Sequence, residues 1–198
     1  MFLFLKNRPS NYYFYVKITK KNLYNKYLCK TFYNKKTIVT EIKLRGDREI
    51  EQIPSLKDKA LRINLNENIY GTFSEIGAGQ ETVRHFFRAG GSSGTIAKAM
   101  SAYDKDFSDA IYGEEEDGRY VTESRLRKML AHETELMEQR LKRERHPNKL
   151  FFSYANTVAT IDFAKKFKGH GWVGINYQLE PNEGYNEIIL HIRFKETD

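Results

Sequence analysis

Seven of the 13 glycines in this chain of 198 residues fall in one short stretch, from Gly71 to Gly113. Most of them form two clusters, Gly77-Ala78-Gly79 and Gly90-Gly91-Ser92-Ser93-Gly94, and each cluster precedes a segment whose apolar residues have helical spacing. Glycine in such a place indicates a backbone that turns tightly or closely approaches another group. Where a glycine-rich loop runs into a helix, unpaired N–H groups and the helix dipole favour an anion such as phosphate. The stretch therefore predicts a phosphate-binding loop or, alternatively, a pair of tight connections between packed helices.

The second glycine cluster has the more complete set of phosphate-binding groups. Its backbone N–H groups and hydroxyls are followed, one turn into the expected helix, by a lysine. It is not a P-loop, because the Gly-Lys-[Ser/Thr] ending is missing, and Thr82 stands where a Rossmann fingerprint after Gly77 would need its third glycine. We expect the phosphate contacts to come from Gly91, Ser92, Ser93, Gly94, Thr95, Lys98 and Arg88.

The apolar pattern changes its period along the chain, which predicts an α+β fold with helices first and an antiparallel sheet after them. Leu61, Ile63 and Leu65 alternate as a short strand would. Helical spacing then predicts helices over about 80–89, 95–111 and 122–145, the second from the stripe Ile96, Met100, Tyr103, Phe107 and Ile111. Alternation beyond Pro147 predicts strands over about 150–163, 172–179 and 187–194.

Charge is unevenly distributed along the chain. The formal net charge is +7, with 33 Lys+Arg and 26 Asp+Glu. Residues 1–45 hold 11 of the basic residues and one acid, a net charge of +10, so the remainder carries 22 − 25 = −3. Nucleic-acid binding needs basic residues gathered on a folded surface. We therefore do not expect it of residues 46–198, and RNA binding through the basic N-terminal segment stays an alternative.

Residues 1–45 also differ from the rest in composition, being dominated by Phe, Tyr, Lys and Asn. Three interpretations are open: a basic aromatic arm, an extra strand pair at 12–19 and 37–44, or upstream sequence translated from a misplaced start. We expect residues 46–198 to form a single α+β domain and residues 1–45 to be an extension outside it.

The cellular setting follows from cysteine use and from hydropathy. Cys29 is the only cysteine, so no internal disulfide can form. No apolar run approaches the roughly 20 residues that span a bilayer, and Phe2 to Leu5 precede the first basic residues, the reverse of a secretory signal. We expect a cytoplasmic protein without a membrane partner. The five histidines lack ligand spacing, so we expect no metal site, and the sequence indicates no particular cofactor.

His170 is the histidine best placed for chemistry. It stands in Gly169-His170-Gly171-Trp172, at the start of an expected strand. A glycine-flanked histidine there is accessible and can act as an acid or base near neutral pH. We expect His170 to be catalytic, and a loop histidine bonded to the backbone is the alternative.

A set of motifs extends from about residue 63 to 193. It includes Glu75-Ile76-Gly77-Ala78-Gly79-Gln80-Glu81, His85-Phe86-Phe87-Arg88-Ala89-Gly90-Gly91, Ser108-Asp109-Ala110-Ile111-Tyr112-Gly113 and His170-Gly171-Trp172. These motifs resemble a bacterial family of poorly characterised cytosolic proteins, whose members commonly carry the names nicotinate-nucleotide (nicotinic acid mononucleotide) adenylyltransferase or TonB-dependent receptor. The resemblance covers the N-terminal portion of the family's longer architecture, which implies a truncated product.

Of the two names, adenylyltransferase is the one that the residues better accommodate. A TonB-dependent receptor needs an export signal and a long series of barrel strands, neither of which the sequence indicates. Two departures remain. Adenylyltransferases of the nucleotidyltransferase superfamily use an H-x-G-H signature, whereas Gly169-His170-Gly171-Trp172 has one histidine, and the family's usual Asp-Thr-Val is Asn156-Thr157-Val158 here.

The leading hypothesis is a nucleotide- or phosphate-binding protein. The resemblance implies adenylyl transfer, with ATP and a nicotinate nucleotide as the small-molecule partners. The alternative is a non-enzymatic scaffold or assembly domain whose glycines serve packing. Such a domain would associate with further copies of itself as a homo-oligomer.

Overall fold

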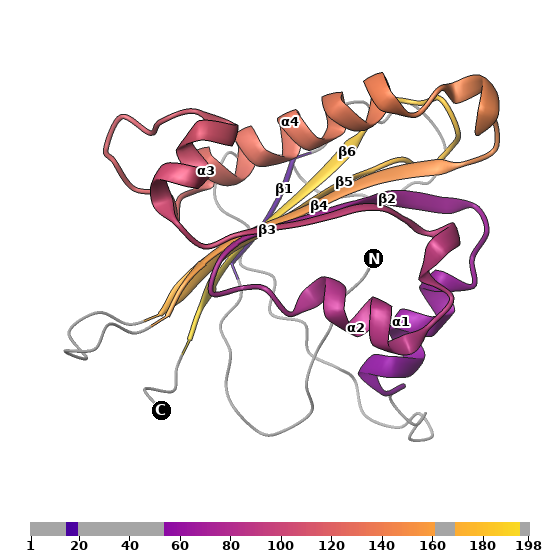
Figure 1. The fold of residues 1–198 in the computed structure, drawn as a ribbon, viewed down its shortest axis with the longest axis horizontal. Coiled ribbons are helices and arrows are strands. Elements are labelled where there is room, and N and C mark those ends of the chain that lie inside the picture. The colour runs from indigo at the N-terminus through magenta and orange to yellow at the C-terminus, as the bar shows by residue number, and fades with distance from the viewer. Residues whose placement is uncertain (1–14, 20–53, 161–168, 195–198) are drawn as a thin grey trace, which may run out of the picture.

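The computed structural model describes residues 15–19, 54–160 and 169–194, which form one mixed sheet with helices on both faces (Figure 1). The strands follow the order β1-β6-β5-β4-β2-β3 across the sheet. Their bounds are β1 Tyr15–Thr19, β2 Ile69–Gly77, β3 Ile96–Ala102, β4 Leu150–Ala159, β5 His170–Tyr177 and β6 Asn186–Arg193. The helices are α1 Leu56–Asn64, α2 Thr82–Ala89, α3 Lys105–Tyr112 and α4 Glu123–Arg140, with the 3-10 turns η1 Ser92–Gly94 and η2 Arg143–Arg145.

The predicted α+β class, with helices packed on a C-terminal antiparallel sheet, is wrong. Strand β2 lies between β3 and β4 and is parallel to both, whereas β4, β5, β6 and β1 pair antiparallel. Strands and helices therefore alternate along the first half of the fold. The physical reason is that parallel neighbours need a crossover. Helix α2 connects β2 to β3, and the chain then returns through α3 and α4 to place β4 on the other side of β2.

The helix predicted over 95–111 is the main local error. The structure divides that range into strand β3, a short connection and helix α3. Asp104 begins α3, because its side chain accepts a hydrogen bond from the Phe107 N–H at 2.9 Å. The apolar stripe is not one face: Tyr103 and Phe107 are 72% and 60% exposed. The apolar pattern of residues 96–102 fits the two-residue period of a strand as well as the helical period. Pairing with β2 makes this segment a strand.

The strand predicted around residues 61–65 is also wrong, since these residues fall at the end of helix α1. A capping box starts that helix: the Ser55 hydroxyl accepts from the Asp58 N–H, and the Asp58 carboxylate accepts from the Ser55 N–H. Ala60 and Ile63 then bury one side of the helix. By contrast, α2 and α4 lie within the predicted ranges 80–89 and 122–145.

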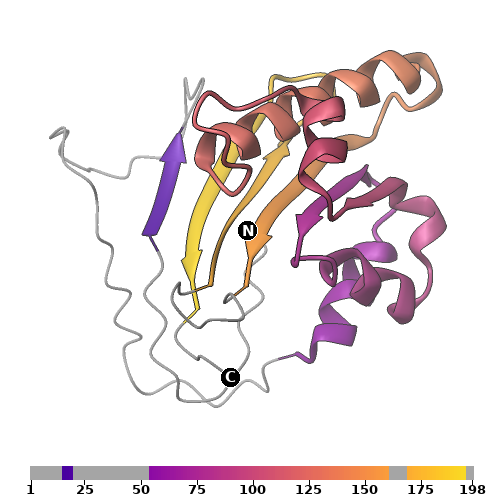
Figure 2. The ribbon, with the colours of Figure 1, turned by 60° about the vertical axis from the view of Figure 1, so that its left-hand side comes forward.

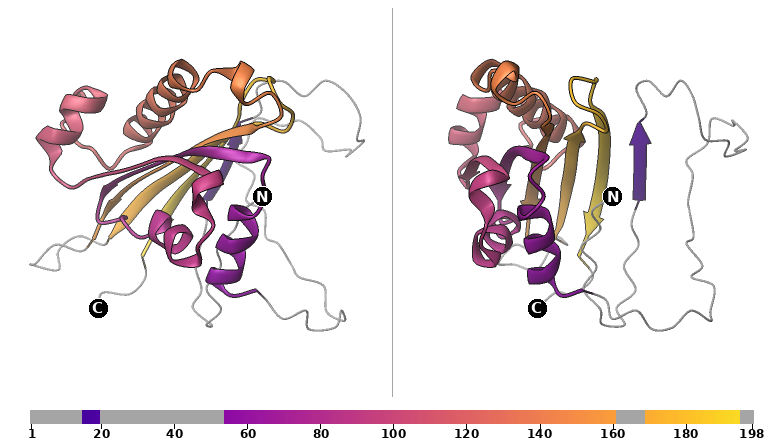
Figure 3. Two further views of the ribbon diagram at one scale, coloured as in Figure 1. Left: turned by 45° about the vertical axis from the view of Figure 1, so that its right-hand side comes forward. Right: turned by 90° about the vertical axis from the view of Figure 1, so that its right-hand side faces the viewer.

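Each face of the sheet has its own hydrophobic cluster, and the two pairs of helices cover opposite faces (Figures 1 and 3). Helices α1 and α2 lie against one face, where the cluster includes Ala60, Ile63, Phe73, Val83, Phe86 and Phe152. Helices α3 and α4 lie against the other, with Ile76, Ala102, Tyr112, Leu126, Met129, Leu130, Ala155 and Ile189. The buried Arg125 joins the second pair, since its guanidinium contacts the Asp109 carboxylate.

Strand β1 adds to the sheet beside β6, at the opposite edge from β3 (Figure 2). The register runs from Tyr15 opposite His191 to Thr19 opposite Glu187. The proposed strand at 37–44 and Cys29 lie outside the described residues. That residues 1–45 lie outside the domain stays a prediction.

Candidate functional site

The loop predicted to bind phosphate lies at the amino end of the parallel strands. Its last residue, Thr95, is fully buried and uses its polar groups within the protein. The Thr95 hydroxyl donates to the Asn64 carbonyl at 3.0 Å, and its N–H donates to the Ser92 carbonyl at 3.0 Å. Because a strand and not a helix follows Thr95, the helix dipole that the prediction invoked is absent from this position.

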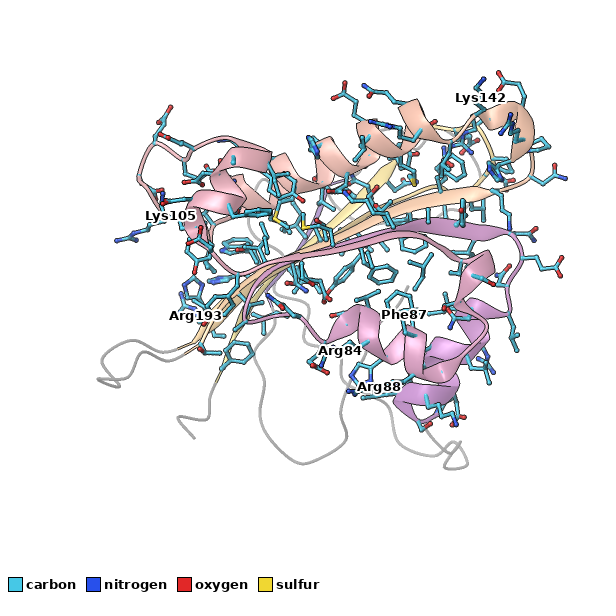
Figure 4. All side chains as sticks on the ribbon, in the orientation of Figure 1. Arg84, Phe87, Arg88, Lys105, Lys142 and Arg193 are labelled. Carbon is cyan, nitrogen blue, oxygen red and sulfur yellow. The ribbon has the colours of Figure 1, made fainter. Side chains whose placement is uncertain are left out.

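Lys98 and Arg88, the two predicted cationic contacts, lie on opposite faces of the sheet. A bulge between Gly71 and Thr72 shifts the β3 register by one residue and turns Lys98 toward α4. There its ammonium group contacts both carboxylate oxygens of the buried Glu133, at 2.8 and 2.7 Å. Arg88 lies on α2 on the other face, 3.8 Å from the Glu81 carboxylate (Figure 4).

The N-terminus of α2, which follows the first glycine cluster, is capped by a carboxylate from the neighbouring strand. Glu75 of β2 is fully buried, and its carboxylate accepts from the Thr82 N–H at 3.0 Å. Burial raises the pKa of Glu75, and the hydrogen bonds from Thr82, Val83 and Asn156 act in the opposite direction. The N–H groups at this helix end are therefore already hydrogen-bonded to a carboxyl group of the protein itself.

The hydrogen bonds of Asn156 explain why an amide, and not a carboxylate, stands at this position. Its side-chain N–H group donates to the Glu75 carboxylate at 2.9 Å and to the Gly79 carbonyl at 2.8 Å. An ionised aspartate could not donate either bond and would place a second carboxylate beside Glu75. Sequence reasoning missed this pair, although a glutamate inside the apolar run of β2 was a signal that it needed a buried partner.

His170, the predicted catalytic residue, lies at the opposite end of the sheet from the glycine loop. Gly71 pairs with Ile96 at the amino end of β2, whereas Gly77 pairs with Val158 at its other end, and Ala159 pairs with His170. Six residues of extended strand separate these ends by about 20 Å. The structure thus does not bring His170 together with residues 91–98.

Three other side chains accompany His170 on one face of β5 and β6. His170 pairs with Arg193 across the two strands, and Trp172 pairs with His191, so all four side chains project to the same side. This is the α4 side, because Gly174, two residues after Trp172, lies against Leu130. We call these four residues, His170, Trp172, His191 and Arg193, the carboxyl-edge cluster.

The side chains of the carboxyl-edge cluster lie close together. The His191 Nε2 and His170 Nδ1 atoms are 3.4 Å apart. The His191 ring stacks on Trp172 with 4.3 Å between ring centres and an interplanar angle of 9°. Arg193 is exposed at the end of the sheet (Figure 4), and it forms no ion pair with any of the described residues.

The surroundings of the cluster favour the neutral form of both histidines, because they lower both pKa values. Burial lowers the pKa of His170, and the Arg193 charge lowers it further. Burial is also the largest cause that lowers the pKa of His191, followed by His170 and Arg193, while Glu123 raises it. Two neutral imidazoles beside a guanidinium can each accept a proton when an anion offsets the added charge.

The carboxyl-edge cluster lies on β5 and β6, at the same edge of the sheet as the carboxyl ends of the parallel strands, with β4 between it and β2. The carboxyl ends of β2, β3 and β4 meet at this edge, and the connections after β2 and β3 leave toward opposite faces of the sheet. Gly77, with φ of 72°, turns the backbone there, and a Cβ on it would lie 2.2 Å from the Val158 carbonyl oxygen. The loop after β2 therefore stays close to β4.

Comparisons with known proteins find likeness in solved structures alone. No protein-family model matches the chain, and no curated protein matches it significantly. The competence/damage-inducible protein CihA from Agrobacterium tumefaciens has a TM-score of 0.48 at 14% identity, over 73% of this chain and 84% of that chain. A CinA-superfamily protein from Enterobacter cloacae has a TM-score of 0.47 at 11% identity, over 78% and 87%. Such values do not assign the chain to that superfamily or transfer a function to it.

Two further findings concern membrane spans and metal sites among the described residues. None of their helices is both long enough and apolar enough to cross a membrane. Nor do three or more of their His, Cys, Asp and Glu side chains gather as a metal site requires.

Proposed function

We propose that this protein binds a phosphate-bearing nucleotide at the carboxyl-edge cluster, with His170 as the acid–base group. The observation that carries the proposal is the pair of histidines, 3.4 Å apart between ring nitrogens, beside Arg193 at the edge of the sheet where the carboxyl ends of the parallel strands also lie. Adenylyl transfer to nicotinate mononucleotide, the activity implied by the family resemblance, is the finer form of this proposal.

The chemistry of that transfer suits such a cluster. A phosphate oxygen of the mononucleotide attacks the α-phosphorus of ATP, the bond from that phosphorus to the bridging oxygen breaks, and pyrophosphate leaves. Little covalent chemistry falls to the protein, so catalysis rests on positioning and on neutralising the phosphoryl charge. Arg193 supplies a permanent charge for this, and His170 and His191 supply charge once a phosphate raises their pKa values.

Isothermal titration with ATP and with nicotinate mononucleotide separates this site from the glycine loop. We expect His170→Asn and Arg193→Gln each to weaken binding by about tenfold, the effect of roughly 1.4 kcal/mol, and Lys98→Ala to leave the dissociation constant unchanged. Folding of each variant is checked by circular dichroism. Absence of heat from the folded wild-type protein, or weakening by Lys98→Ala alone, contradicts the proposal.

The pH dependence gives a second and local measurement. In the free protein both histidines have lowered pKa values, and bound phosphate favours their protonated forms. We expect nicotinate mononucleotide to raise both pKa values in an NMR titration, so that protons are taken up on binding. His132, on α4, serves as the internal control. Unchanged pKa values at saturating ligand would place the binding elsewhere.

A non-enzymatic assembly domain is the second candidate, and one observation favours it. Strand β3 ends the sheet with an edge that no other described strand covers.

A further inference from the structure

Strand β3 has a bulge at Ala97 but little other protection of the kind that edge strands usually carry. Among the described strands it pairs with β2 alone, and it contains no proline and one charged residue, Lys98. That charge is drawn onto the α4 face by Glu133. Ala99 and Ser101 are exposed on the opposite face. Natural sheets commonly protect such edges with exposed lysines, prolines or strong bulges, because an open strand can pair with another chain.

We propose that two copies of this chain pair antiparallel through β3 to form one continuous sheet. The bulge next to Ala97 leaves Lys98 to Ala102 as the regular part of the strand, with Met100 at its centre. A two-fold axis at Met100 places Ala99 opposite the partner's Ser101 and Lys98 opposite the partner's Ala102. Every such pair is free of opposed like charges, so the strand is complementary to itself.

The two ends of β3 are complementary in charge. Asp104 and Asp106, both exposed, follow its carboxyl end. At its amino end the Lys149 ammonium group lies 3.5 Å from the Gly94 carbonyl oxygen. Antiparallel pairing brings the carboxyl end of one strand to the amino end of the other, so these acids approach the partner's Lys149 on both sides of the axis.

A second copy fits this edge better than an unrelated extended peptide for a specific reason. The acids and the base that face each other across the axis are supplied by the same chain at opposite ends of the same strand. The small exposed side chains of Ala99 and Ser101 also allow two sheets to meet without a protruding group between them. The proposal is independent of the nucleotide site, which lies on β5 and β6.

Sedimentation equilibrium over a range of concentrations tests the pairing. We expect the full chain to approach twice the monomer mass as concentration rises. The double variant Ala99→Lys/Ser101→Lys, which places lysines opposite lysines, is expected to remain monomeric. Ala131→Lys adds a lysine at an exposed position of α4 and is the matched control, expected to dimerise like the wild type. A monomeric wild type, or a dimer that survives the double substitution, overturns the proposal.

Cysteine cross-linking tests the register. In a Cys29→Ser background, one sample of Ala99→Cys is mixed with a size-tagged sample of Ser101→Cys and oxidised. The mixed pair is expected to form a disulfide at least tenfold faster than Ala131→Cys mixed with itself. Equal rates would contradict antiparallel pairing about Met100 even if a dimer is present.

Discussion

At the scale of single residues, Lys98 and Glu133 show how one contact changes the meaning of a motif residue. Lys98 follows a glycine loop, yet its ammonium group pairs with the fully buried carboxylate of Glu133, a residue of α4. The same carboxylate accepts from the Tyr112 hydroxyl at 2.9 Å, and burial beside Glu133 raises the pKa of Tyr112. A lysine committed to a buried acid in this way is not available to a ligand without exposing that acid.

This contact predicts a stability effect at Lys98. Lys98→Ala leaves the Glu133 carboxylate buried without its counter-charge, and removing one partner of a fully buried pair costs about 3–5 kcal/mol. Because the Lys98 side chain is 34% exposed, we expect about 2 kcal/mol, measured by urea unfolding. Adding Glu133→Gln removes the buried charge and should recover part of the loss. A Lys98→Ala protein as stable as the wild type would show that the contact contributes nothing.

At the scale of elements, the glycines divide into those that the packing requires and those that it does not. A Cβ on Gly71 would lie 2.0 Å from the Phe152 carbonyl oxygen of the neighbouring strand, whereas a Cβ on Gly94 would meet nothing within 4 Å. We expect Gly71→Ala to lower the free energy of unfolding by about 3 kcal/mol or more and Gly94→Ala to change it by less than about 0.5 kcal/mol. Chemical denaturation of both variants measures this, and a large loss at Gly94 would contradict it.

The elements that sequence could predict are those with a single dominant period. Helix α4 and the three strands after it follow such patterns, and α2 is ended by Gly90. The errors fall where two periods fit the same residues, as in 96–102, and only pairing with β2 identifies the strand there. The direction of the strands could not be predicted from local patterns either. Whether β4 lies parallel or antiparallel to its neighbour depends on crossovers between distant segments.

The residues of the candidate site could likewise be predicted only in part. The sequence singled out His170 because glycines flank it, but nothing local to residue 170 points to His191 or Arg193, which reach it through the β5–β6 register. It also grouped His170 with the glycine loop, since both suited phosphate. Their separation to opposite ends of the sheet follows from the strand register alone.

At the scale of the whole molecule, the sheet and its cores predict what residues 1–45 contribute. The described clusters draw on residues between Ala60 and Ile189, and β1 adds to the sheet at its edge beside β6. We propose that residues 46–198 fold without the preceding segment. Deleting residues 1–45 should lower the melting temperature by less than about 4 °C, the effect of roughly 1 kcal/mol in a chain of this size. Deleting residues 1–14 alone, which keeps β1, is the control. If the longer deletion unfolds the protein and the shorter one does not, pairing of β1 with β6 is essential and the domain begins before residue 46.

If the longer deletion instead leaves a folded protein that aggregates, the uncovered edge of β6 is the physical cause. The substitution Leu190→Lys, on the strand edge that β1 covers, should then restore solubility.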